Sequence, residues 1–464
     1  MEKALYLDTA RLGKMSKAAK AAQVAFTRLA GTEPASARFD DFLVQGISAF
    51  PRGLRARFEG LSSWHGLSGL KAALRKRAGA SGDLPVLLAN RSTQLMRLAA
   101  RLLFLRTKRV LVTDLEWPAY RGILECEAKR TGGEVKEVFL REAVFQDRIT
   151  ANEVVSAVTE HYLKNDCGGM FLSGVTFDGV KLPVKDISRE LSQAGHMPFV
   201  TVDGAQAFCH APSELGEGYC DFYLAGCHKW LGAYHPMGVG FCGRERSEGL
   251  VMATLEAMTE AAELDDPLLN FTTRRECGMK EQFTETVSLG PLFSSAASLA
   301  ENLDEMPLPN EGFARLQQNR ACLEDASIGT SWSPLAPHES LRSGILLLQA
   351  RSPLLKREAP EAIRGRFQER GITLTAYEGS VLRLSAQRLP LSTEERSRLR
   401  LGLTVRGNEP KTKGLDFTPS LDRTRVRSRC QGALRSSWTR GQRRAEKTLE
   451  MASIHVSQQN LGMS

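Results

Sequence analysis

Most of the chain alternates short apolar runs with amphipathic stretches. Apolar runs of strand length stand at residues 84–90, 109–114, 168–175, 198–203, 220–226 and 237–243. Apolar residues at helical spacing stand at 92–105 and 184–196, which predicts helices there. Short apolar strands separated by amphipathic helices are typical of a mostly parallel sheet that is covered on both faces. The pattern therefore predicts an α/β fold.

The pattern changes after about residue 300. An apolar strand is predicted at 343–350, a strand-rich stretch at 371–386 and a closing helix at 392–405, which together indicate a smaller α+β domain. A chain of 464 residues is long enough for two or three domains. We expect four parts: an N-terminal segment at 1–30, a large domain at 31–295, a small C-terminal domain at 296–405 and a tail at 406–464.

The basic character of the chain is concentrated in its tail. Residues 406–464 hold 12 Lys and Arg against 5 Asp and Glu, so they carry +7 of the net charge of +9. The tail is poor in periodic apolar residues, and we expect it to be disordered, with a short basic helix near 439–452 as an option. Its aromatic residues are Phe417 and Trp438, too few for the interleaved stacking of single-strand nucleic-acid binders. We therefore expect a solvated tail and no nucleic-acid partner.

Composition also bears on location and metals. The sequence has no apolar run of about 20 residues and no signal-peptide pattern at its start, so we expect a cytoplasmic protein with no membrane partner. The nine cysteines are an odd number and include no C-x-x-C pair. This argues against a disulfide framework and against a zinc site, and no metal site is predicted.

Polar residues follow the predicted strands of the large domain. In an open α/β sheet, ligands bind at the carboxyl ends of the strands. The candidates at these ends are Asn90 to Thr93, Asp114 to Trp117, Ser173 to Thr176, Asp203 with Gln206, and His228 with Lys229.

Each candidate taken alone has two interpretations. Ser92 and Thr93 begin a helix and could bind a phosphate, or they could cap the helix. Asp203 could face a bound cation, or it could form a turn cap or an ion pair. Lys229 could form a Schiff base with an aldehyde cofactor, or it could be a surface charge. Trp117 could stack on a flat heterocycle, or it could belong to the core.

The order and spacing of these residues resemble the class V aminotransferase family of pyridoxal 5′-phosphate (PLP)-dependent enzymes, a group with cysteine desulfurases, kynureninases and isopenicillin N epimerase-like proteins. The stretch "VTVDGAQAFCHAPSELGEGYCDFYLAGCHKWLGAYHPMGVGF" (200–241) resembles the family signature, and residues 6–16, 108–122 and 381–387 also fit. The resemblance covers about residues 1–405. It implies a PLP-dependent transferase of fold type I, in which the large domain binds PLP and the N-terminal segment packs near the active site. It also implies a homodimer.

The resemblance implies roles around the cofactor ring. Lys229 would hold PLP as a Schiff base and move the proton during catalysis, and Asp203 would pair with the pyridine nitrogen. Gln206 would bind the phenolic oxygen, and Trp117 would stack on the ring. Thr176 would face the ring, although the loop "SGVTFDGVKLP" is one residue shorter than usual, which leaves Asp178 as an alternative.

The resemblance also implies a phosphate site and a substrate site. Ser92, Thr93 and His228 would bind the phosphate, and Thr284 would reach the phosphate of the neighbouring subunit. Arg383 would bind the carboxylate of the substrate in bidentate fashion. One departure is Gly226, which stands where the family often has a serine two residues before the histidine.

The implied function is that of an aminotransferase-like enzyme acting on an amino acid or a related amine. The alternatives are a PLP-dependent lyase, epimerase or cysteine desulfurase, or a non-catalytic relative whose basic tail binds polyanions. Desulfurases keep a nucleophilic cysteine in a loop well after the lysine. Between Lys229 and the tail this chain has Cys242 in a predicted strand, Cys277, and Cys322 in a helical pattern, which disfavours that activity.

Overall fold

The computed structural model describes residues 4–32, 39–80, 82–276, 286–305 and 309–404. Residues 1–404 form one compact unit. The predicted division between a large and a small domain falls inside this unit and stays a prediction. The predicted tail, with its optional helix near 439–452, lies outside the described residues.

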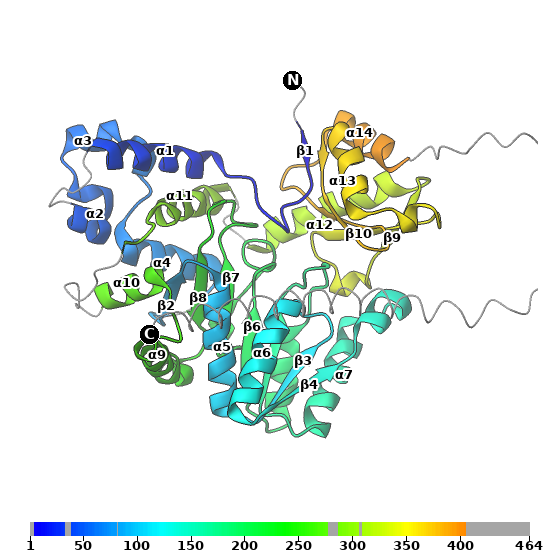
Figure 1. Cartoon of the computed structure of the whole chain (residues 1–464), viewed down its shortest axis with the longest axis horizontal. Coiled ribbons are helices and arrows are strands. Elements are labelled where there is room, and N and C mark those ends of the chain that lie inside the picture. The colour runs from blue at the N-terminus through cyan, green and yellow to red at the C-terminus, as the bar shows by residue number, and fades with distance from the viewer. Residues whose placement is uncertain (1–3, 33–38, 81, 277–285, 306–308, 405–464) are drawn as a thin grey trace, which may run out of the picture. The chain divides into compact units, whose positions relative to one another are not determined.

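A seven-stranded sheet forms the centre of the unit (Figure 1). Its order is β2-β8-β7-β6-β5-β3-β4, and β8 is antiparallel to its neighbours while the other pairings are parallel. The predicted mostly parallel sheet and all six predicted strands are confirmed. The strands are β2 (Val86–Ala89), β3 (Arg109–Thr113), β4 (Glu134–Val138), β5 (Gly169–Ser173), β6 (Phe199–Asp203), β7 (Phe222–Gly226) and β8 (Gly238–Cys242).

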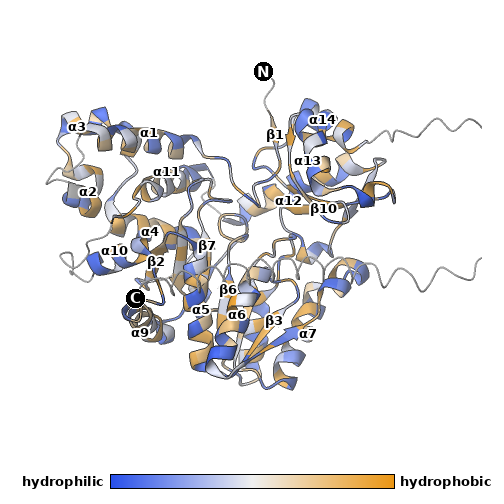
Figure 2. Cartoon of the chain, in the orientation of Figure 1, coloured by the Kyte–Doolittle hydropathy of each residue, from blue (hydrophilic) through white to orange (hydrophobic). Residues whose placement is uncertain are grey.

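Helices cover the central sheet and bury its strands completely. Every residue of β2, β5, β6, β7 and β8 is buried, which requires cover on both faces. In Figure 2 the central strands are largely orange, whereas the surrounding helices carry blue faces. The helices of the first 276 residues are α1 (Lys17–Thr32), α2 (Phe39–Gln45), α3 (Arg52–Arg57), α4 (Gly66–Ala78), α5 (Ser92–Arg106), α6 (Pro118–Thr131), α7 (Ala151–Lys164), α8 (Val184–Gln193), α9 (Glu245–Glu260) and α10 (Pro267–Glu276).

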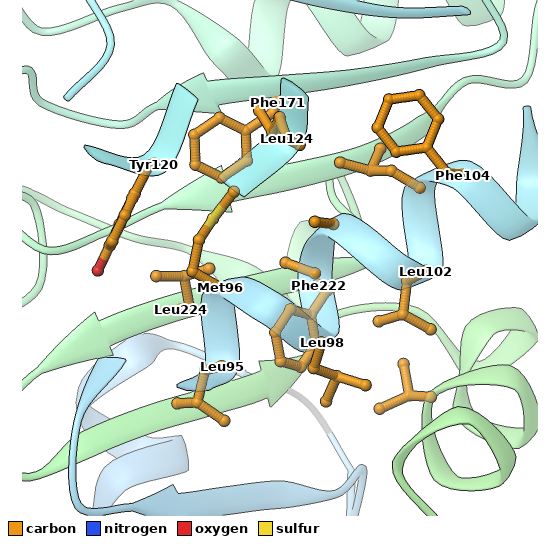
Figure 3. Packing of buried hydrophobic residues seen from close by; sticks show 14 of the residues in the cluster. Leu95, Met96, Leu98, Leu102, Phe104, Tyr120, Leu124, Phe171, Phe222 and Leu224 are labelled. Carbon is orange, nitrogen blue, oxygen red and sulfur yellow. The ribbon is translucent and has the colours of Figure 1, made fainter. Parts of the chain in front are cut away.

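Helix α5 forms the main contact between sheet and helices. Its apolar residues recur at spacings of three and four, as predicted, and this places them on the faces that pack against the sheet and α6. Figure 3 shows this cluster, which includes Leu95, Met96, Leu98 and Leu102 of α5, Leu124 of α6, Phe171 of β5 and Phe222 of β7. Full burial of one such side chain contributes about 1.5–3 kcal/mol. The first turn of α5 is therefore held firmly at the edge of the sheet.

The last part of the unit is a smaller α+β arrangement, as predicted. Its antiparallel sheet has the order β12-β13-β10-β9. The predicted strand at 343–350 is confirmed as β10, and the predicted closing helix is confirmed as α14, which begins with a capping box between Ser392 and Glu395. The elements are α12 (Pro309–Ser327), β9 (Trp332–Leu335), β10 (Ile345–Ala350), α13 (Pro360–Glu369), β12 (Thr375–Tyr377), β13 (Val381–Ser385) and α14 (Thr393–Leu403). Helix α11 (Gly290–Glu305), which precedes them, packs against α1 and α4 instead.

The N-terminal segment connects the two larger sheets. Strand β1 (Leu5–Tyr6) pairs in parallel with β11 (Ile372–Thr373). Further along, the Gly13 N–H donates to the His228 carbonyl at 2.8 Å, and the Ser16 N–H donates to the Gly232 carbonyl at 2.9 Å. A Cβ atom on Gly13 would lie 1.9 Å from the Lys229 carbonyl oxygen, so glycine is needed for this approach.

Within the described residues, none of the helices combines the length and the apolar character that a membrane span requires.

Candidate functional site

The candidate site lies at the carboxyl edge of the central sheet. Asp203 is the last residue of β6, and Lys229 follows three residues after the end of β7. Parallel β6 and β7 pair directly, so these two residues emerge at the same edge. Charge interactions link Lys229 with Asp203 and with Arg383 of β13. The structure therefore brings together residues that are far apart in the sequence.

Lys229 has an unusually acidic ammonium group. Its side chain is only partly exposed, and burial lowers its pKa from 10.5 to about 8. The charge of Asp203 opposes this shift, and the positive charge of Arg383 adds to it. The neutral, nucleophilic amine is thus accessible near physiological pH.

Asp203 is buried, and burial raises its pKa from 3.8 to about 6. The Ala205 N–H, which donates to Oδ1 at 2.8 Å, and the charge of Lys229 oppose that shift. A buried carboxylate of this kind is stabilised by a cation. Asp203 can therefore pair with a protonated nitrogen of a ligand at this edge.

Two further ionisable residues lie beside Asp203: Glu116, which belongs to the predicted stretch Asp114 to Trp117, and Tyr120, which was not predicted. Glu116 accepts hydrogen bonds from the Ser173 N–H at 3.1 Å and from the Thr113 hydroxyl at 3.0 Å, and burial raises its pKa to about 8. Burial also raises the pKa of Tyr120, and the charge of Asp203 adds to this. Glu116 joins the ends of β3 and β5 next to Asp203.

The first turn of α5 carries Ser92 and Thr93. Arg91 is the N-cap residue and its side chain makes no capping hydrogen bond, so the predicted alternative of capping by Ser92 or Thr93 is wrong. Ser92 Oγ lies 2.9 Å from the Tyr120 hydroxyl oxygen, and Thr93 is exposed. The N–H groups of a first helical turn attract anions. This end of α5 can therefore hold a phosphate.

Trp117 is exposed at the site rather than buried in the core. It immediately precedes α6, and its side chain is 45% exposed. The Phe177 ring contacts it edge to face, with centroids 5.3 Å apart and an angle of 72°. The exposed face of Trp117 is thus available for stacking on a flat ligand.

Gln206 is buried and bonded to the protein. Its Nε2 donates to the Ala10 carbonyl at 2.7 Å, and its Oε1 accepts from Trp230 Nε1 at 2.9 Å. The amide still has one N–H in addition to the one used by Ala10. Contact with a ligand oxygen through that second N–H is compatible with this arrangement.

Thr176 and Asp178 bond to each other. The Thr176 hydroxyl donates to the Asp178 carboxylate and accepts from the Val180 N–H at 3.0 Å. Asp178 also forms an ion pair with Arg141 at 2.6 Å. Both side chains therefore stabilise the turn that carries Phe177.

Arg383 is buried, and one of its three side-chain nitrogens has no hydrogen-bond partner among the described residues. Nη1 donates to the Phe177 carbonyl at 3.1 Å, and Nη2 donates to Thr375 Oγ1 at 3.4 Å. Nη2 also lies 3.7 Å from Asp8 Oδ1. Among the described residues, Nε of Arg383 has no hydrogen-bond partner. A buried donor without a partner is unfavourable, so a ligand oxygen would stabilise this group.

His228 lies against the glycine that departs from the family pattern. A Cβ atom on Gly226 would lie 2.9 Å from His228 Cε1 and 3.0 Å from Nδ1. The absence of a side chain at Gly226 therefore lets the imidazole occupy this position. Burial lowers the pKa of His228 to about 4, so the ring is neutral at pH 7.

We predict that Gly226→Ala destabilises the protein by about 1–3 kcal/mol, because the new methyl group crowds the His228 ring. Thermal unfolding of the cofactor-free protein measures this loss. In a His228→Ala background the same substitution should be nearly neutral. Equal losses in both backgrounds would show that the His228 ring is not the cause.

The predicted Thr284 lies outside the described residues. The signals for the missed residues were weak because each has a common structural explanation. Tyr120 is close in sequence to Trp117, whereas Asp8 and His210 are identified only by contacts made in the folded chain. Within the described part of the chain, no group of three or more His, Cys, Asp and Glu residues could hold a metal ion.

Comparison with known families bears on the fold. Residues 67–254, which include α5, Trp117, Asp203 and Lys229, match the family model of the class V aminotransferases. This part of the chain is similar to the class V aminotransferase family. This confirms the resemblance on which the candidate site was predicted.

One curated relative is isopenicillin N epimerase of Amycolatopsis lactamdurans. It is 31% identical over 143 residues, which are 31% of this chain and 34% of that protein. The chain therefore matches only about a third of the length of this class V relative.

Two solved structures of class V enzymes extend the likeness to most of the chain. A C-DES mutant with glycine covalently linked to its PLP cofactor has a TM-score of 0.62 and 15% identity, over 86% of this chain and 96% of that one. Ureidoglycine–glyoxylate aminotransferase of Bacillus subtilis has a TM-score of 0.61 and 13% identity, over 87% and 92%. This likeness shows the fold, and the predicted fold type I is confirmed.

Proposed function

We propose that this chain is a PLP-dependent, class V aminotransferase-like enzyme that acts on an amino acid or a related amine through Lys229. The lowered pKa of Lys229, beside the buried carboxyl group of Asp203, supports the proposal most strongly. A lysine that reacts with an aldehyde must lose its proton, and burial near a second cation favours that loss.

The residues of the site fit PLP. The first turn of α5 has no side-chain cap and carries Ser92 and Thr93, which suits a phosphate. Trp117 offers an exposed ring face. Arg383 has a buried donor without a protein acceptor, which suits the carboxylate of an amino acid. When bound, PLP supplies an electrophilic aldehyde and an electron-accepting pyridinium ring.

Each residue then has a physical task. Lys229 Nζ would hold the cofactor and would take and return a proton during turnover. Asp203 would accept a hydrogen bond from the ring nitrogen and stabilise its positive charge. Trp117 would cover the ring and exclude water.

The other residues orient the cofactor and the substrate. Ser92, Thr93 and His228 would bind the phosphate, and Gln206 would donate its second N–H to the phenolic oxygen. Thr176 supports the ring side of the site through its turn, and Arg383 orients the substrate carboxylate.

Absorption spectroscopy tests the proposal. The purified protein is titrated with PLP, and a new near-visible band that borohydride bleaches is expected. Reduction makes the link to the cofactor permanent, so peptide mass mapping should place the adduct on Lys229. No band, or an adduct on another lysine, would overturn the proposal. Product analysis with panels of amino acids and keto acids then separates amino transfer from elimination, epimerisation and desulfuration.

The pH dependence of cofactor capture is a second expected result. Since the pKa of Lys229 is about 8, its neutral amine should increase about tenfold per pH unit up to about pH 8 and then level off. Stopped-flow absorbance with PLP measures the capture rate. Nα-acetyl-lysine is the control for the ionisation of PLP itself, and its rate should still rise near pH 10. If the capture rate of the protein also still rises near pH 10, the pKa of Lys229 is not lowered.

The cysteines do not favour the desulfurase alternative. Cys242 is buried in β8, and Cys322 lies within α12. Neither lies in a loop that could carry sulfur to and from the site. Cys277 lies outside the described residues.

A homodimer is part of the proposal and rests on the family resemblance, whereas the proposed cytoplasmic location rests on the sequence pattern alone. Size-exclusion chromatography with light scattering tests the dimer.

A further inference from the structure

A buried histidine outside the cofactor set lies at the centre of several contacts. His210 is 3% exposed and follows Gln206 by four residues. Its Nδ1 lies 2.7 Å from the Gln206 carbonyl oxygen, and its Nε2 lies 2.8 Å from the Gly344 N–H. Because the backbone N–H of Gly344 can only donate, His210 Nε2 must accept, and the hydrogen of the neutral ring is on Nδ1. Burial lowers the pKa of His210 to about 4, so this neutral form is the stable one.

On one side, His210 supports the residues around Lys229. Its ring stacks on Trp230 with centroids 3.7 Å apart and an angle of 17°. Trp230 immediately follows Lys229, and its Nε1 donates to Gln206 Oε1 at 2.9 Å. The same histidine therefore contacts both the backbone of Gln206 and the neighbour of the cofactor lysine.

On the other side, His210 contacts the strand pair that carries Arg383. Gly344 precedes β10, and within the β10–β13 pairing Leu347 is opposite Arg383. The Gly344 carbonyl also accepts from the Ala386 N–H, three residues beyond Arg383, at 2.8 Å. The approach is close, since a Cβ on Gly344 would lie 2.7 Å from His210 Nε2.

We propose that His210 is a positioning residue that sets the distance between the Lys229 side of the site and Arg383. The inference rests on the proposed function, because it assigns the cofactor to Lys229 and the substrate carboxylate to Arg383. A rigid link of this kind matters because both ends of a small amino acid must be held in register with the reacting atoms. One ring with two directional hydrogen bonds and one stacking contact provides that link.

Two variants separate the two halves of the link. His210→Asn places an amide N–H near Nδ1, so it keeps the bond to the Gln206 carbonyl and loses the acceptor for Gly344. His210→Gln reaches the Gly344 N–H with its amide oxygen and loses the bond to Gln206. Exposed His196 provides the matched control, His196→Asn.

The expected result is a reciprocal split. His210→Asn should raise KM for the amino substrate roughly tenfold and leave the Kd for PLP within about twofold. His210→Gln should raise the Kd for PLP roughly tenfold. Both variants remove the ring that stacks on Trp230, so both should change the tryptophan fluorescence of the cofactor-free protein. His196→Asn should match the wild type in all three measurements.

If both variants bind PLP more weakly and turn over more slowly in proportion to their lower melting temperatures, with no difference between the KM and Kd effects, the role of His210 is merely structural and the inference is overturned.

A second measurement covers variants that fold poorly. ¹⁵N-histidine spectra of the wild type should show one histidine held as the Nδ1–H form from about pH 5.5 to 8. Titration of every histidine in that range would also overturn it. An active wild type with unsplit variants refutes only the His210 inference, whereas a wild type that binds no PLP refutes the proposed function and this inference with it.

Discussion

Lys229→Ala will abolish the borohydride-sensitive link to PLP and lower turnover of the amino substrate by at least about 10⁴-fold. The substitution removes both the amine that holds the cofactor and the base that moves the proton. Neither effect should come from unfolding of the protein. Burial disfavours the charged form of Lys229, so removing its ammonium group should not lower the free energy of unfolding. The variant should still bind PLP non-covalently through α5 and Asp203. Circular dichroism and equilibrium dialysis check the fold and this residual binding.

Two experiments test whether the effect of Lys229→Ala is due to the loss of this particular amine. Methylamine should fit the space left by the lysine side chain and restore part of the turnover through its neutral fraction, so the rescue should grow with pH. Lys185→Ala is the matched control, because that ammonium group forms ion pairs with Glu214 and Glu217 away from the site. A Lys229→Ala variant that keeps the reducible link would mean that another lysine holds the cofactor.

The central sheet could be predicted because burial on both faces leaves a continuous apolar signal. All residues of β6 and β7 are buried, so their sequences contain uninterrupted apolar runs. Strand β4 was missed for the opposite reason. It lies at the edge of the sheet, and its residues Glu134, Lys136 and Glu137 hide the strand pattern.

The site could be predicted only where its residues are close together in the sequence and keep a recognisable order and spacing. Asp203 and Lys229 are ends of adjacent strands, and their spacing survives in the sequence. The partners of Gln206 cannot be predicted in this way, because Ala10 precedes it by 196 residues and contacts it only in the folded chain. The same holds for Arg383 and Asp8, where a buried charge pair joins β13 to the N-terminal segment. No local pattern reports such contacts.

Asp203→Asn will have two effects of opposite sign. Turnover should fall about 10²–10³-fold, because the neutral amide cannot stabilise the positive charge of the ring nitrogen. Capture of PLP at neutral pH should become faster. The charge of Asp203 raises the pKa of Lys229, so its removal lowers that pKa below about 8 and increases the neutral amine. Steady-state kinetics and stopped-flow absorbance measure the two rates on the same preparation.

Glu116→Gln is the matched control for this pair of effects. It lies beside Asp203 and burial raises its pKa to about 8, so near pH 7 it is mainly protonated and an amide resembles it in shape and charge. Turnover and capture should both stay within about threefold of the wild type. Slower turnover together with slower capture in Asp203→Asn would point to a general disruption of the site. Slower turnover together with faster capture in Asp203→Asn, with neither change in Glu116→Gln, would assign two roles to Asp203. It would stabilise the ring nitrogen and control the pKa of Lys229.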